Sequence, residues 1–250
     1  MTDLSGKTAL VTGGGAGLGA DLARGLADAG ATVWIAGRTE ARLAKVADAH
    51  PGIQPAVANV TDEAGVATLF DRIGAPEIVL ANAGASESAP LARTELDTWD
   101  RMIGVNLTGV FLTFREAARR LGKAPSWARL IAVASTAGLK GYPYVTAYTA
   151  SKHGVVGLVR AAAQEFVRTG ATVNALCPGF LETEMTERSI ANIMDKTGKS
   201  AEAARESLAA MSPQKRLIQP AEVTRAALWL CGPGSEGITG QAISISGGEV

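Results

Sequence analysis

Short runs of β-branched or aliphatic residues alternate repeatedly with longer stretches of helical patterning along this chain. The predicted strands are Thr8–Thr12, Thr32–Ala36, Gln54–Ala58, Ile78–Ala81, Leu130–Ala134, Thr172–Ala175 and Ala242–Ser246. The predicted helices cover about residues 17–29, 40–49, 62–73, 97–121, 148–168 and 220–231. Most strand runs are almost continuously apolar, which is typical of strands buried on both faces of a parallel sheet. The alternation therefore predicts an α/β fold with a doubly wound parallel sheet and right-handed crossovers.

Length and composition fit one such domain. The chain has 250 residues, of which 47% are hydrophobic and 19% are charged, so a substantial core is expected. We expect a single domain over residues 1–250. The stretch from Phe180 to Gln219 is polar, carries charges of both signs and shows no obvious strand. A connection of this length in a compact domain is usually functional, so residues 180–219 are predicted to form a lid over an active site.

Charge and cysteine content exclude several classes of function. The chain has 24 Lys and Arg against 24 Asp and Glu, without a basic run, which argues against nucleic-acid binding. No apolar stretch approaches the roughly 18 residues of a membrane span. Cys177 and Cys231 stand far apart and only two histidines are present, so we expect no metal site. Isolated cysteines suit a reducing compartment, and a cytoplasmic protein is expected.

A glycine-rich turn follows the first predicted strand and opens the first predicted helix. It reads Thr12-Gly13-Gly14-Gly15-Ala16-Gly17-Leu18-Gly19. Glycine lets a pyrophosphate approach the backbone, and the N–H groups and dipole at the start of a helix attract the anion. The turn therefore predicts a nucleotide phosphate site. Two registers are open: Gly13, Gly17 and Gly19, or Gly15, Gly17 and Ala20.

The end of the second predicted strand bears on the choice of nucleotide. A fold that prefers NAD usually has Asp or Glu here to accept from the ribose 2′-hydroxyl, whereas this chain has Gly37 followed by Arg38. A guanidinium can bind a 2′-phosphate through two parallel hydrogen bonds, so NADP(H) is favoured. NAD(H) remains possible, because Glu40 is close enough in sequence to reach a ribose. The alternative for Arg38 is a solvated side chain at a strand end.

Tyr148 and Lys152 lie four residues apart in a predicted helix and therefore share one face. A free phenol has a pKa near 10, too high for ready proton exchange at neutral pH. A cation at about 4 Å in a partly buried site contributes around 4 kcal/mol, or roughly three pKa units. We therefore expect Lys152 to bring the pKa of Tyr148 close to 7, where acid–base catalysis is effective. A chance pair on a helix surface is the alternative.

The motifs taken together resemble the short-chain dehydrogenase/reductase family in its single-domain branch. In chain order they are Thr12–Gly19, Ala81-Asn82-Ala83-Gly84, Val105-Asn106, Ser135, Tyr148 with Lys152, and Pro178-Gly179-Phe180-Leu181-Glu182-Thr183. The resemblance covers nearly the whole chain, from Gly6 to Gly248. It implies a Rossmann fold and an oxidoreductase that interconverts a ketone and a secondary alcohol with a nicotinamide cofactor.

The resemblance also implies a catalytic tetrad. Tyr148 would protonate the carbonyl oxygen as hydride arrives, and Ser135 would donate a hydrogen bond to the same oxygen. Lys152 would lower the pKa of Tyr148 and bind the nicotinamide ribose. Asn106 would hold a water that links Lys152 to solvent. Hydrogen-bond donors that are already in place around a developing alkoxide make the largest contribution to catalysis in such a reaction.

The same resemblance implies a set of cofactor contacts. Ala81 replaces the first Asn of the family's Asn-Asn-Ala-Gly segment, and Asn59 replaces an Asp that usually contacts the adenine, so an acceptor is kept without its charge. The implied contacts are Gly13, Gly15, Gly17, Leu18, Gly19, Arg38, Asn59, Val60, Asn82, Ala83, Gly84, Tyr148, Lys152, Pro178, Gly179 and Thr183. Turn-forming Asn, Gly and Pro in loops without any ligand are the alternative.

The substrate side is less constrained. We expect a cleft lined by Ala85–Pro90, Thr136–Tyr144 and Phe180–Met211, with scattered cations near its entrance. The chain is most similar to 3-oxoacyl reductases and hydroxyacyl dehydrogenases, which suggests a carbonyl substrate carried as a coenzyme A or acyl-carrier thioester. A sugar, steroid or polyol dehydrogenase is an alternative within the family, and a non-catalytic NADP(H) redox sensor is an alternative outside catalysis. The family also implies a homotetramer or homodimer.

Overall fold

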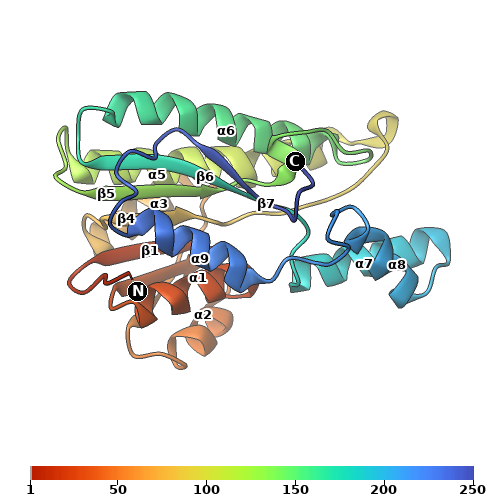
Figure 1. Ribbon diagram of the computed structural model, residues 1–250, viewed down its shortest axis with the longest axis horizontal. Coiled ribbons are helices and arrows are strands. Elements are labelled where there is room, and N and C mark those ends of the chain that lie inside the picture. Colours follow the sequence, from red (N-terminus) through yellow and green to blue (C-terminus); the bar gives the residue numbers. More distant parts are fainter. Residues whose placement is uncertain (1) are drawn as a thin grey trace.

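The computed structural model describes residues 2–250 and contains one seven-stranded sheet (Figure 1). All neighbouring strands are parallel, in the order β3-β2-β1-β4-β5-β6-β7. The strands are β1 (Thr8–Thr12), β2 (Thr32–Gly37), β3 (Ile53–Val57), β4 (Ile78–Ala81), β5 (Ala128–Val133), β6 (Ala171–Pro178) and β7 (Ala242–Ile245). The predicted doubly wound fold is confirmed.

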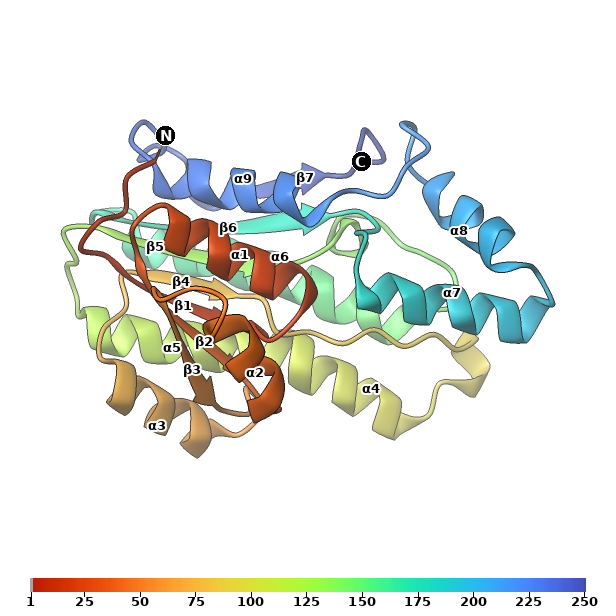
Figure 2. The same cartoon turned by 90° about the horizontal axis from the view of Figure 1, so that it is seen from below.

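Helices cover both faces of this sheet (Figures 1 and 2). The helices α1 (Gly17–Asp28), α2 (Glu40–Ala47) and α9 (Pro220–Cys231) pack on one face. On the other face lie α3 (Glu63–Ile73), α5 (Gly109–Leu121) and α6 (Thr146–Phe166). Each face has its own cluster of buried aliphatic side chains, which explains why the strands read as continuous apolar runs.

One predicted helix is interrupted. The expected helix over 97–121 consists of α4 (Leu96–Ile103), a π-helical turn (Gly104–Thr108) and α5. The widened turn carries Asn106, which is fully buried. Single π-helical turns inside α-helices occur often at functional sites. The prediction of one continuous helix was therefore wrong at the point where a candidate catalytic residue lies.

The strand order places the candidate residues at one edge. The chain runs outward from β1 to β3 and then returns to β4 on the other side of β1. Such a reversal opens a crevice beyond the carboxyl ends of the strands, where ligands of these folds bind. The segments that follow β1, β4, β5 and β6 all begin at this edge, and they include the glycine-rich turn, Asn82–Gly84, Ser135 and Pro178–Thr183.

Residues 180–219 form a flap that projects beyond this edge (Figure 1). The flap contains α7 (Glu184–Thr197) and α8 (Ala201–Ala209), and a single parallel bridge between Leu181 and Ile218 closes its base. Its small apolar cluster consists of Ile190, Ala204, Leu208 and Leu217, separate from the two sheet clusters. Nowhere in residues 2–250 does a helix combine the length and apolarity needed to cross a membrane.

Candidate active site

The glycine-rich turn is packed tightly against the segment after β4. The Thr12 hydroxyl accepts hydrogen bonds from the backbone N–H groups of Asn82 and Ala83, both at 3.0 Å. In return, the Asn82 side-chain amide donates to the Thr12 carbonyl at 2.9 Å. A Cβ on Gly13 would stand 2.8 Å from the Cα of Ala83. These contacts hold two of the predicted cofactor segments, residues 12–19 and 82–84, against each other.

Backbone geometry favours one of the two registers. Gly13 and Gly17 have φ of +68° and +50°, where a side chain is strained. A Cβ on Gly19 would lie 2.2 Å from the Gly13 carbonyl oxygen. Gly15 has no positive φ, and the side chain of Leu18 belongs to the core. Of the glycines in the two registers, Gly13, Gly17 and Gly19 are therefore the ones that the backbone requires, whereas only the backbone of Leu18 is available to a ligand.

The start of α1 is open to an anion. Its N-cap is Ala16, which supplies no side-chain hydrogen bond, and no acid lies in its first turn. At α3 and α8, by contrast, a side chain accepts from one of these N–H groups: Asp62 accepts from the Ala64 N–H, and Ser200 accepts from the Ala203 N–H. The four N–H groups at the start of a helix need acceptors. An uncapped, acid-free helix start behind a glycine turn fits a pyrophosphate.

The end of β2 presents an unengaged cation. Arg38 is exposed, and within residues 2–250 it makes no hydrogen bond or ion pair. Arg42, on α2, lies beside Gly15 and bridges to Glu184 of the flap at 3.1 Å. Arg38 is therefore free to bind a ligand, which agrees both with a 2′-phosphate contact and with a solvated side chain.

Two other predicted contacts are engaged locally. Asn59 accepts from the Thr61 N–H at 3.2 Å through its own side chain, and Val60 is buried against Gly109. The Asn59 contact is an ordinary turn-stabilising bond, so an adenine contact by this pair stays a prediction.

A second group of predicted residues lies close together next to the crevice: Asn106, Lys152 and Gly84. The Asn106 amide pairs with the backbone of Ala85 in both directions, with each hydrogen bond 2.9 Å long. A Cβ on Gly84 would lie 3.1 Å from Asn106 Oδ1 and 3.7 Å from Lys152 Nζ. Lys152 Nζ donates to the Val133 carbonyl at 2.8 Å, at the end of β5. The structure thus gathers three predicted residues that lie far apart in sequence.

Ser135 and Tyr148 complete the cluster. Ser135 follows β5 and caps a short 3-10 turn by accepting from the Ala137 N–H at 3.1 Å. Tyr148 lies in the first turn of α6, and its ring centroid is 5.6 Å from Lys152 Nζ. Burial raises the pKa of the Tyr148 phenol above its ordinary value, and the Ser135 hydroxyl opposes that shift.

The prediction that Lys152 brings the pKa of Tyr148 close to 7 is wrong for the protein chain itself, because that pKa is raised. Spacing on the helix placed both residues on one face, but the ammonium bonds to a backbone carbonyl instead of the phenol. Burial also lowers the pKa of Lys152 itself, to about 8. Desolvation therefore outweighs the mutual attraction that the sequence suggested.

The flap side of the crevice brings together the remaining predicted segments. Thr183, the N-cap of α7, lies 3.5 Å from the position of a Cβ on Gly17, so the flap begins next to the glycine-rich turn. Gly179 is held to β7 through the Ile245 carbonyl, following Pro178 at the end of β6.

The three segments predicted to line the substrate cleft also touch one another. Asn192 of α7 donates to Ser88 at 3.0 Å, and the Ala89 N–H donates to the Tyr144 carbonyl at 2.8 Å. The loop 85–90 thus contacts both the flap and the loop before α6.

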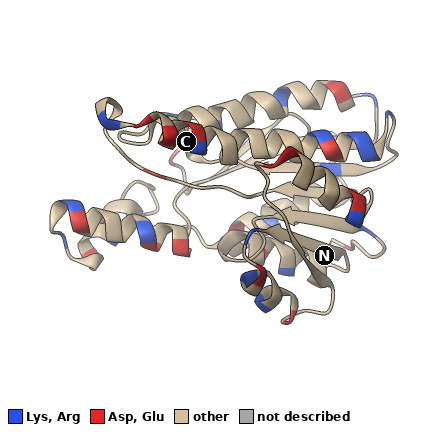
Figure 3. Cartoon of the chain, turned by 180° about the vertical axis from the view of Figure 1, so that it is seen from behind, with Lys and Arg blue, Asp and Glu red and all other residues tan. Residues whose placement is uncertain are grey.

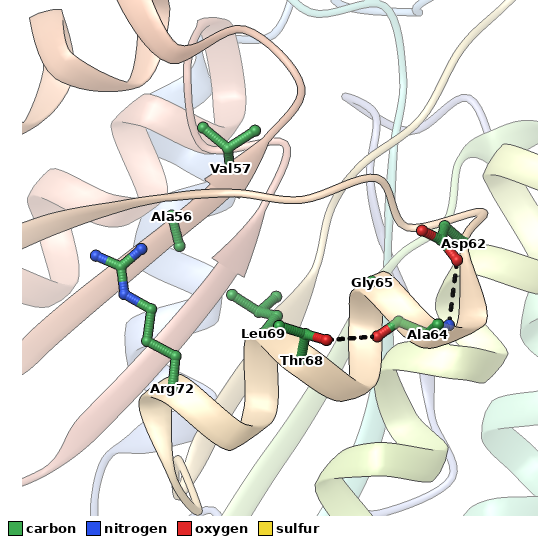
Figure 4. Close-up of a pocket in the computed structure, with 8 residues that line it drawn as sticks. All are labelled: Ala56, Val57, Asp62, Ala64, Gly65, Thr68, Leu69 and Arg72. Atoms are coloured by element: carbon green, nitrogen blue, oxygen red, sulfur yellow. Dashed lines mark hydrogen bonds between the residues drawn. The ribbon is translucent and has the colours of Figure 1, made fainter.

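A separate groove lies between β3 and α3 (Figure 4). Its lining includes Val57, Thr68 and Arg72. The side chains of Asp62 and Thr68 each hydrogen-bond to the backbone of Ala64 at the start of α3. None of the candidate catalytic or cofactor residues lines this groove, so it is distinct from the crevice.

Comparisons with known proteins agree with this geometry. The short chain dehydrogenase family model matches residues 7–193. The chain is 36% identical to a 3-oxoacyl-(acyl-carrier-protein) reductase of Thermotoga maritima, covering 99% of both proteins. It is 34% identical to a D-beta-hydroxybutyrate dehydrogenase of Rhizobium meliloti, over 97% of this chain and 98% of that protein.

Among solved structures, the fold matches a variant of actinorhodin polyketide ketoreductase crystallised with NADPH. The TM-score is 0.92 at 33% sequence identity, covering 100% of this chain and 99% of the other. The matched segments include the glycine-rich turn, the crevice and the tyrosine–lysine helix described above. This chain therefore belongs to the short-chain dehydrogenase/reductase family and is an NAD(P)-dependent oxidoreductase that interconverts a carbonyl and an alcohol.

Proposed function

We propose that the chain, acting as one domain, is an NADP(H)-dependent reductase of 3-oxoacyl thioesters or closely related ketones. The observation that carries the proposal is the cluster at the carboxyl edge of the sheet. It joins Asn106, Ser135, Tyr148 and Lys152 to the end of β5 and to Gly84, next to a helix start that is open to a pyrophosphate.

A bound nicotinamide supplies the hydride, and the residues of the chain handle the proton. Hydride addition to the carbonyl carbon leaves negative charge on its oxygen, and the Tyr148 hydroxyl transfers its proton there, giving the alcohol and a phenolate. Ser135 donates a hydrogen bond to the same oxygen and so favours the charge that develops. Lys152 stabilises the phenolate by its charge, because an opposite charge nearby favours the ionised form.

Burial of Tyr148 bears on the direction of the reaction. Because the pKa of Tyr148 is raised, its phenol stays protonated at neutral pH. Ketone reduction needs this form, whereas alcohol oxidation needs the phenolate. We therefore expect reduction to proceed through neutral pH and oxidation to accelerate as the pH is raised.

Asn106 acts mainly on the backbone in this proposal. Its two hydrogen bonds to Ala85 hold the segment after β4 against the π-helical turn. This fixes Gly84 beside Lys152, where a Cβ would lie 3.7 Å from the ammonium. A water held at Asn106 would then return a proton through Lys152 to Tyr148.

Arg38 supports NADP(H) as the cofactor. It is exposed at the end of β2 and free of acidic partners in the described residues, so it can pair with a 2′-phosphate without first breaking another contact. The solved relative with NADPH has the same fold.

The relatives support the substrate class. One is named for a 3-oxoacyl group on acyl-carrier protein and another for hydroxybutyrate. Both names describe a ketone or alcohol at carbon 3 of an acyl chain. Charges of both signs mix over α7 and α8 (Figure 3), so the flap offers no one-sign surface for an acidic carrier. Coenzyme A and acyl-carrier thioesters therefore both remain within the proposal.

Assembly and location follow the family. We propose a homotetramer in the cytoplasm. The two cysteines, Cys177 and Cys231, are both free and buried, which suits a reducing compartment.

Oxidation of NADPH by the purified protein tests the proposal. The panel is 3-oxobutanoyl coenzyme A, ethyl 3-oxobutanoate, a steroid ketone and a keto sugar, with NADH in parallel. The account predicts the highest kcat/KM for the 3-oxoacyl thioester with NADPH. Preference for the sugar or steroid would assign another substrate class. Binding of NADPH without reduction of any carbonyl would favour a redox sensor.

A further inference from the structure

The turn after β7 carries a buried carboxylate that the family motifs do not include. Gly247 and Gly248, with φ of +64° and +88°, turn the chain back toward the loop before α6 (Figures 1 and 2). The Glu249 N–H donates to Ser246 Oγ at 3.2 Å and closes this turn. The side chain of Glu249 is only 2% exposed.

Within residues 2–250, both partners of the Glu249 carboxylate lie on the loop between Ser135 and Tyr148. The Tyr142 hydroxyl is 2.5 Å from Glu249 Oε1 and 2.7 Å from Thr136 Oγ1. Lys140 Nζ lies 3.2 Å from the same carboxylate oxygen. The other oxygen, Oε2, is 3.4 Å from the position of a Cβ on Gly179. The carboxylate thus bridges the active-site loop and the segment after β6.

A contribution to stability does not by itself explain why a carboxylate is buried here. Removing a carboxylate from water is costly, and its attraction to the Lys140 ammonium, whose side chain is 39% exposed, often does no more than offset that cost. A buried carboxylate does define geometry, because hydrogen bonds to a charged acceptor are short and directional. Here that geometry fixes one ring, Tyr142, on a loop predicted to line the substrate cleft.

The phenol of Tyr142 is fully engaged. Burial and the hydrogen bond to Glu249 raise the pKa of Tyr142 far above its ordinary value, so it keeps its proton and donates it to the carboxylate. A phenol has one proton, so the Thr136 hydroxyl must donate its own to the Tyr142 oxygen. With both sides occupied, the ring cannot swing away. The Tyr142 hydroxyl therefore bonds to Thr136, the residue next to Ser135, whose own hydroxyl hydrogen-bonds to the Tyr148 phenol.

We propose that Glu249 is a positioning residue for the carbonyl substrate, holding the Tyr142 ring as a fixed wall beside Tyr148. The inference rests on the proposed ketone reduction. A fixed wall admits a prochiral ketone with one of its faces toward the cofactor, whereas a mobile ring admits both. Glu249 therefore governs the binding and orientation of the ketone and leaves cofactor binding alone.

The test uses ethyl 3-oxobutanoate with NADPH and follows KM for each, kcat and the enantiomer ratio of the alcohol. In Glu249→Ala, we expect KM for the ketone to rise about threefold to tenfold, the range of one lost hydrogen bond. The enantiomer ratio should fall while KM for NADPH stays unchanged. Glu249→Gln, whose amide oxygen can still accept from Tyr142, should recover most of the wild-type ratio. Tyr142→Phe should reproduce the defect, and the double variant should add nothing to it.

Glu116→Ala is the matched control. Glu116 is equally buried, with its side chain 4% exposed, and pairs with Arg119 at 2.6 Å on α5, away from the active-site loop. It should lose stability without a change in ketone KM or enantiomer ratio. An unchanged KM and ratio in Glu249→Ala, or the same changes in Glu116→Ala, would overturn the inference.

Two further outcomes are separable. If Glu249→Ala does not fold, Tyr142→Phe, which keeps the ring, decides by the same readouts, and wild-type values in it overturn the inference. If the wild-type protein reduces no ketone, the proposed function fails and this inference fails with it. Reduction by the wild type with unaltered variants rejects the inference alone.

Discussion

The cofactor edge of the sheet is packed much more tightly than the flap. At the edge, a single methyl group on Gly13 or Gly19 would collide with backbone atoms, and Leu80 behind it is fully buried. The flap has a small apolar cluster of its own, and the buried residues of α7 and α8 are only Thr186, Ile190, Ala204 and Leu208. Its ties to the body include the exposed Arg42–Glu184 pair and the Asn192–Ser88 hydrogen bond.

This difference indicates a division of labour. Groups that transfer a proton must be held within a fraction of an ångström. Ser135 accordingly lies just beyond the end of β5, and Tyr148 and Lys152 lie on α6, which packs against the sheet. Elements that admit and release substrates are drawn from the less stable parts of a protein. The account thus assigns chemistry to the sheet edge and substrate entry to the flap.

Tyr148→Phe should give the largest effect and locates the chemistry at the sheet edge. Without its hydroxyl the site loses its acid, and kcat should fall by about 10²- to 10⁴-fold. NADPH affinity, measured by fluorescence titration, should stay nearly unchanged because the glycine-rich turn is untouched. Comparable turnover in this variant would remove Tyr148 from the proposed reaction.

A pair of leucine truncations tests the difference in packing. Leu80→Ala in β4 should lower the free energy of unfolding by about 2–5 kcal/mol. Leu208→Ala in α8 should change global unfolding by less than about 1 kcal/mol, because the flap opens separately. It should instead raise the ketone KM and speed proteolysis within residues 180–219. Equal losses in denaturant melts would show that flap and sheet unfold as one unit.

Lys152→Met should stabilise the fold while abolishing activity. Burial lowers the pKa of Lys152 from 10.5 to about 8. Its charge thus opposes folding fully below pH 8, and the penalty fades as the pH rises from 8 toward 10.5. At pH 7 the variant should gain roughly 1–3 kcal/mol in unfolding free energy, after allowing for the Val133 carbonyl left without its donor.

The gain in unfolding free energy should be smaller when unfolding is measured at higher pH. Lys196→Met, at an exposed flap position, is the control and should leave stability unchanged. A loss of stability in Lys152→Met at pH 7 would mean that the ammonium is well solvated or well paired in the fold.

Arg38→Asp should have the smallest effect and concerns only the far end of the cofactor. An acid repels a 2′-phosphate and accepts from a ribose hydroxyl, so the ratio of kcat/KM for NADPH and NADH should shift toward NADH by at least about tenfold, or 1.4 kcal/mol. An unchanged ratio would mean that the phosphate is bound elsewhere, for example by Arg42, which lies beside Gly15.

Much of the fold could be predicted because its signals are local. Short β-branched or aliphatic runs identified every strand, and the glycine-rich turn marked the start of α1. The break at Gly104–Thr108 could not, because one widened turn preserves the helical periodicity on both sides. The only hint in the sequence was a glycine at each end, Gly104 and Gly109.

The site was predicted as a set of residues but not as an electrostatic arrangement. Spacing placed Tyr148 and Lys152 on one face, yet it could not show that the Val133 carbonyl would take the ammonium. The Glu249–Tyr142 contact joins residues 107 positions apart. Two consecutive glycines before Glu249 indicate a turn, but they do not indicate its destination.

A crystal structure of the complex with NADPH tests the central claim most directly. The account predicts the pyrophosphate over the turn from Gly13 to Gly19, with the nicotinamide ring reaching the Tyr148 hydroxyl. A nucleotide bound away from this turn, or a nicotinamide ring that Tyr148 faces away from, would contradict it.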